Sequence, residues 1–147
     1  MKLSERIFED IKAAQKNGET ERLGVLRFLL AQIHNREIEK GAQATGLPDE
    51  EVMQVLQKEA KKRREAITLF AQGNRLDLVR KEEGELKILE TYLPPALSRA
   101  EIGKVVDDLR GEGVSDLNGL MKAAMQRLKG QADGRLVREI IEEKLKS

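Results

Sequence analysis

Apolar residues recur every three to four positions along most of the chain, the spacing typical of amphipathic helices. The first 93 residues contain four such stretches, expected at residues 3–16, 21–40, 48–72 and 76–93. The second stretch is apolar around most of its circumference, whereas a helix on a surface has one apolar stripe. We therefore expect this second helix at the centre of the first part of the chain.

Two consecutive prolines, Pro94 and Pro95, should end the fourth helix, because a residue that precedes proline avoids the α conformation. Beyond them the pattern predicts three shorter helices, the first of which begins with a capping box at Ser98. The sequence thus predicts an all-α fold. An N-terminal bundle of about four helices, residues 1–93, is followed by a smaller three-helix C-terminal domain, residues 96–147.

Composition excludes several classes of function. The chain has no cysteine, so a thiolate metal site, a disulfide framework and a cysteine nucleophile are excluded. The single histidine, His34, has no serine or cysteine partner in a known motif, and no glycine-rich phosphate loop follows a strand. We predict no catalytic residue, no metal and no cofactor. Neither a signal peptide nor a membrane-spanning apolar run is evident, so we expect a cytoplasmic protein without membrane contacts.

The net charge of +1 hides local clusters. The apolar stripe of the third helix is interrupted at Arg63 and Arg64, and that of the fourth at Glu82 and Glu83. We expect at least one ion pair between these two sets, since both gaps fall where the helices meet. Such a polar seam could also be an enzyme's site, but structural ion pairs are the simpler interpretation. A basic run that starts at Lys58 could follow a nucleic-acid backbone or simply face water.

The turn before the last expected helix combines glycines, cations and a helix N-terminus, which together favour phosphate binding. A helix end at Gly130 and a cap at Asp133 would give the same sequence for structural reasons alone. If the chain binds nucleic acid, the expected contacts are the cations and glycines in and before this turn: Lys122, Arg127, Lys129, Gly130, Gly134 and Arg135.

Four blocks of the sequence resemble the GatB/YqeY family: ERLGVLR at 21–27, KEEGEL at 81–86, YLP at 92–94 and LKGQADGRLV at 128–137. Their order and spacing extend the resemblance over essentially the whole chain. The family often has Lys-Gly-Arg-Ala-Asp-Gly-Lys in the last block, where this chain has Gln131 in place of the first arginine. One cation is therefore missing from the turn.

The resemblance implies a stand-alone relative of the C-terminal tail of GatB, a subunit of the tRNA-dependent amidotransferase. The family label is carbon-nitrogen ligase activity with glutamine as amido-N-donor, but the catalytic portion of GatB is missing, so we expect no activity of the chain alone. We expect a tRNA-associated accessory protein, with tRNA and amidotransferase or aminoacylation components as partners. The alternative is a helical protein–protein interaction module, in which apolar helix faces of the smaller half dock a partner.

Overall fold

The computed structural model describes residues 1–128 and 131–146, and these residues form seven helices and no strand. The predicted all-α fold is confirmed. The chain divides into two compact units, Met1–Leu93 and Pro94–Ser147, so the division falls at the two consecutive prolines. Among the described helices, none combines the length and the apolar character that crossing a membrane requires.

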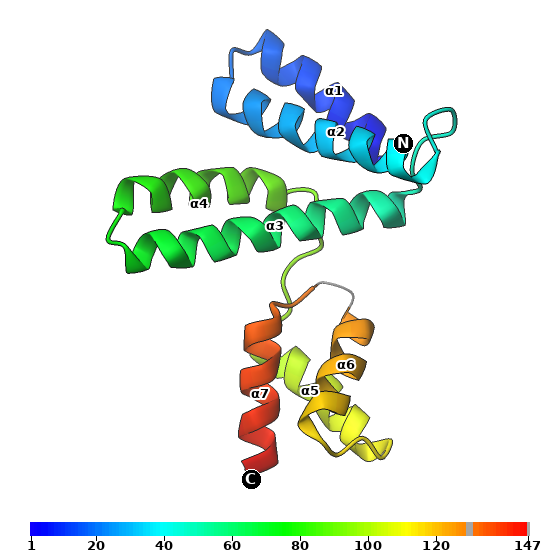
Figure 1. The fold of residues 1–147 in the computed structure, drawn as a ribbon, viewed down its shortest axis with the longest axis vertical. Coiled ribbons are helices and arrows are strands. Elements are labelled where there is room, and N and C mark those ends of the chain that lie inside the picture. Colours follow the sequence, from blue (N-terminus) through cyan, green and yellow to red (C-terminus); the bar gives the residue numbers. More distant parts are fainter. Residues whose placement is uncertain (129–130, 147) are drawn as a thin grey trace. The chain divides into compact units, whose positions relative to one another are not determined.

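The N-terminal unit consists of two antiparallel helical hairpins (Figure 1). Helices α1, Leu3–Lys16, and α2, Thr20–Lys40, form the first hairpin. Helices α3, Asp49–Gln72, and α4, Leu76–Glu90, form the second. Helix α2 packs against all three other helices of this unit, as its apolar circumference predicts.

The core of the N-terminal unit lies where the two hairpins meet. Leu26, Leu29 and Ile33 of α2 are fully buried there, together with Leu56 of α3 and Leu89 of α4. The turn between α1 and α2 contains Gly18 at φ 71°, a left-handed conformation that glycine adopts without steric cost. The short turn keeps the two helices side by side.

Helix α4 ends at Glu90, three residues before the predicted end at Leu93. The Thr91 hydroxyl donates to the carbonyl of Ile88 at 2.7 Å and so satisfies a group at the helix end. Tyr92 then turns into the core, where it is 4% exposed. Its hydroxyl donates to Asp10 of α1 at 2.5 Å, which ties the end of the second hairpin to the first.

The C-terminal unit is a bundle of three helices, α5 at Arg99–Gly111, α6 at Leu117–Leu128 and α7 at Gly134–Lys146. Each helix packs against the other two. Their shared core consists of buried apolar residues from all three helices: Ile102, Val106, Leu109, Leu120, Ala124, Leu128, Val137, Ile140 and Ile141.

The predicted cap of α5 is present: the Ser98 hydroxyl oxygen accepts the backbone N–H of Glu101 at 3.1 Å. Asp133 caps α7 in the same way, with its carboxylate accepting the backbone N–H of Arg135 at 3.2 Å. Helices α5 and α7 therefore begin where the sequence pattern places them.

Candidate functional site on the α3–α4 hairpin

One of the cations predicted to contact nucleic acid, Arg127, is held in an ion pair. The guanidinium of Arg127 lies 2.8 and 3.0 Å from the two carboxylate oxygens of Glu112. These hydrogen bonds raise the pKa of Arg127 and lower the pKa of Glu112. Lys122 is exposed and makes no ion pair with the described residues. Arg127 therefore reaches a phosphate only if it releases Glu112.

The turn before α7 is dominated by its cap. The Asp133 carboxylate accepts a hydrogen bond from the backbone N–H of Arg135, and Gly134 is the first residue of the helix. A carboxylate in this position repels a bound anion, although the exposed side chain of Arg135 has no partner among the described residues. Lys129 and Gly130 lie outside the described residues. The proposed phosphate contacts of the turn stay a prediction.

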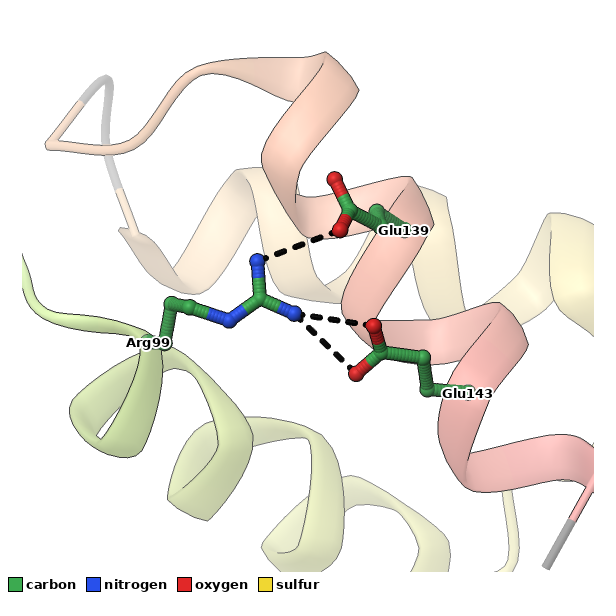
Figure 2. Close-up of polar contacts among 3 residues, drawn as sticks. All are labelled: Arg99, Glu139 and Glu143. Atoms are coloured by element: carbon green, nitrogen blue, oxygen red, sulfur yellow. Dashed lines mark hydrogen bonds and ion pairs between the residues drawn. The ribbon is translucent and has the colours of Figure 1, made fainter.

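A groove of about 510 Å³ between α5 and α7 is bridged by charged side chains. Arg99 extends from α5 toward α7, where its guanidinium lies 2.9 and 3.0 Å from Glu143 and 3.3 Å from Glu139 (Figure 2). Hydrogen bonding to Glu143 raises the pKa of Arg99. Lys144 and Asp107 form a second pair across the groove at 3.0 Å. These contacts bridge α5 and α7 at the exposed edge of the groove, and the shared apolar core holds the two helices together.

Arg63 forms the polar seam between α3 and α4. Its guanidinium lies 3.3 Å from Glu82, within the set of pairs expected from the sequence, and also pairs with Glu85. The Arg63 side chain is 12% exposed and both carboxylates are 20% exposed. The ring of Phe28 from α2 lies 5.6 Å from the guanidinium carbon. An arginine held by two carboxylates and a ring has little freedom to move, which suits a structural role.

The other two residues of the expected seam lie apart from it. Arg64 is 4.0 Å from Glu90 and is more exposed than Arg63. Glu83 is exposed and has no ion pair with the described residues. The sequence analysis missed Glu85, although its position three residues after Glu82 places both on one face of α4.

Residues 61–88, here called the arm, contain no buried residue, and the structure describes all of them. Buried residues of α3 end at Ala60, and those of α4 are limited to Leu89. The arm comprises the second half of α3, the connecting turn and most of α4, and Figure 1 shows these helices side by side. Leu86 and Ile88, near the end of α4, still pack on the core of the N-terminal unit, so only the part of the arm nearer its connecting turn extends beyond that core.

The arm is rich in apolar residues despite this lack of burial. Leu69 is 66% exposed and Leu76 is 56% exposed. Ile67, Phe70 and Val79 are partly buried but do not pack on the core of the unit. Two helices share only one seam, so a hairpin needs a further element to cover its remaining apolar surface. Apolar side chains left exposed on such a hairpin are candidates for an interaction surface.

The comparisons with known proteins establish the family. Residues 4–145 match the family model described as Yqey-like protein. The chain belongs to the YqeY-like family. One YqeY-like relative is "Altered inheritance of mitochondria protein 41, mitochondrial" of Lachancea thermotolerans, 35% identical over 71% of this chain and 56% of the relative. The protein of the same name from Pyrenophora tritici-repentis is 30% identical over 94% of this chain and 78% of the relative. The chain thus spans little more than half the length of the first of these two YqeY-like relatives.

These names correct two expectations drawn from the sequence. The relatives are named as mitochondrial proteins, so the expected cytoplasmic location is wrong. A lack of cysteine suits any reducing compartment and could not distinguish one from another. The names refer to the inheritance of mitochondria and not to tRNA, so the expected tRNA-associated accessory function is wrong as well. Membership of the YqeY-like family fixes a fold, and function depends on the sites that each member carries.

Proposed function

We propose that this YqeY-like chain is a protein-binding module whose arm receives a partner protein. The observation that carries the proposal is the exposure of Leu69 and Leu76 at the end of a helical hairpin without buried residues. Complete burial of one leucine side chain is favourable by about 1.5–3 kcal/mol. A partner that covers the arm would therefore gain affinity without any rearrangement of the core.

The Arg63 seam supports this role because it stiffens the arm before any partner arrives. Arg63 joins α3 to α4 through Glu82 and Glu85, at the point where buried apolar contacts end. A preorganised surface loses less conformational entropy on binding than a mobile one. The partners that the family resemblance implies, amidotransferase and aminoacylation components, are the first proteins to test.

The test compares two double variants of the full chain as bait in an extract of cells that make the protein. Leu69→Ser with Leu76→Ser alters the arm, and Phe8→Ser with Ile38→Ser alters exposed apolar residues elsewhere in the same unit. All four side chains are at least 48% exposed, so both variants should fold. The extract is treated with nuclease and brought to high salt before capture.

We expect the unchanged chain and the Phe8 and Ile38 variant to retain a stoichiometric protein that the arm variant loses. Apolar contacts survive high salt, whereas contacts to phosphates weaken strongly. Equal recovery by the arm variant would overturn the proposal. A protein that is recovered from a parallel untreated extract and lost after nuclease treatment would show that an RNA, and not the arm, holds it.

A further inference from the structure

The unpaired charges of the arm are mostly basic. Four of its exposed cations, Lys61, Arg80, Lys81 and Lys87, make no ion pair with any described residue. Two exposed acids are free in the same sense, Glu65 and Glu83. The other charged residues of the arm neutralise one another or nearby groups, as Arg75 does with Asp77 at 3.2 Å. A partner that docks on the arm therefore meets exposed leucines on a hairpin whose unpaired charges are four cations and two acids.

We propose that the arm receives an amphipathic helix of a partner protein, with apolar residues on one face and acidic residues beside them. This inference rests on the proposed function and specifies the chemistry of the partner. A third helix completes a bundle with α3 and α4, because its apolar stripe can cover Leu69, Leu76 and the residues between them. Its acidic borders would face the free lysines and arginines of the arm.

A second copy of the chain fits this surface less well. Two arms that pair would bring the excess of unpaired cations on one copy, four against two acids, to the same excess on the other. Like charges across an interface disfavour association and so select against this partner. The acidic helix meets the same leucines without that repulsion, which is why the charges favour it.

The probe is a synthetic helix of about 18 residues, long enough at 1.5 Å per residue to cover either helix of the arm. It carries leucines at helical spacing and glutamates at all flanking positions. A twin peptide has lysine in place of every glutamate. Both carry the same dye, and fluorescence anisotropy measures their affinity for the full chain at low and at high salt.

We expect the acidic peptide to bind about tenfold more tightly than its lysine twin at low salt, the effect of two to three weak surface pairs. High salt should reduce this ratio. Lys61→Glu with Lys81→Glu should reverse the preference. The matched control, Lys104→Glu with Lys122→Glu, alters two exposed cations of the C-terminal unit and should leave it unchanged.

In one outcome, the two peptides bind the full chain equally well and both lose that binding in the Leu69 and Leu76 variant. This result would overturn the proposal that the partner helix is acidic, and would still support the arm as a protein-binding surface. Binding of the acidic peptide that survives in that variant would contradict both proposals. Sedimentation of the full chain tests whether a second copy of the chain covers the arm. A dimer that the Leu69 and Leu76 variant dissociates would show that a second copy covers the arm, and would overturn the inference.

Discussion

Replacement of Arg63 by methionine removes the cation that two carboxylates of α4 share. Glu82 and Glu85 would then face each other across the seam with no counter-charge, each only 20% exposed. Methionine keeps most of the apolar volume of the arginine side chain, so the substitution tests charge more than packing. We expect the N-terminal unit to lose stability.

The magnitude follows from the burial of the seam. Removal of one partner from a buried ion pair costs about 3–5 kcal/mol, and an exposed pair contributes about 0–1 kcal/mol. Arg63 is only 12% exposed, but water still reaches both carboxylates, each 20% exposed. We therefore expect a loss of about 2–3 kcal/mol, or a melting temperature lower by on the order of 10–20 °C for a unit of this size.

Tyrosine absorbance provides an assay specific for this unit. Tyr92 is the single tyrosine of the chain, which has no tryptophan, and it lies in the core of the N-terminal unit. Its absorbance during urea or thermal unfolding follows this unit alone, whereas circular dichroism follows both units together. The same probe applies to all of the Arg63 variants and to their Arg75 control, because Tyr92 is unchanged in each.

The matched control is Arg75→Ala, which removes a fully exposed arginine paired with Asp77 and should leave the transition unchanged. A triple variant, Arg63→Met with Glu82→Gln and Glu85→Gln, should recover most of the loss because no unpaired charge remains. If Arg63→Met is as stable as the control, the seam contributes nothing and the argument for a stiffened arm fails.

Three further outcomes are expected. Burial, followed by the bond to Asp10, raises the pKa of Tyr92 from 10.0 to about 12. Stability from this group is complete below pH 10 and is lost between about pH 10 and 12. Tyr92→Phe should abolish that loss in urea titrations followed by circular dichroism. Asp133→Ala should destabilise the C-terminal unit by about 1 kcal/mol, visible as faster amide exchange in α7, and unchanged exchange would show that the cap is dispensable. Arg99→Ala should leave the amide exchange of α7 nearly unchanged, because Arg99 is exposed. Faster amide exchange would show that the ion pairs of Arg99 stabilise the unit.

Much of the fold follows from local signals in the sequence. Apolar spacing locates all seven helices, and Ser98 and Asp133 predict their caps because both depend on neighbouring residues only. The end of α4 is less local. Thr91 and Tyr92 leave the helix early as Tyr92 enters the core and reaches Asp10, a contact that sequence periodicity does not record.

The candidate site could not be predicted because it depends on where packing stops. Ile67 and Phe70 continue the apolar stripe of α3, which predicts that some element covers them. The stripe does not show that no residue of α3 after Ala60 is buried. The seam was partly predictable, since the gaps in two stripes pointed to Arg63 and Glu82, but the choice of Glu85 over Glu83 required the structure.

Photo-crosslinking in cells that make the protein tests the central claim most directly. A photoreactive amino acid replaces Leu76 in the arm or, as a control, Phe8 in α1, both exposed in the N-terminal unit. The account predicts one discrete protein crosslinked through position 76 and absent from the control. It would be contradicted by a crosslink from position 76 to the chain's own C-terminal unit, or by the same protein crosslinked equally through both positions.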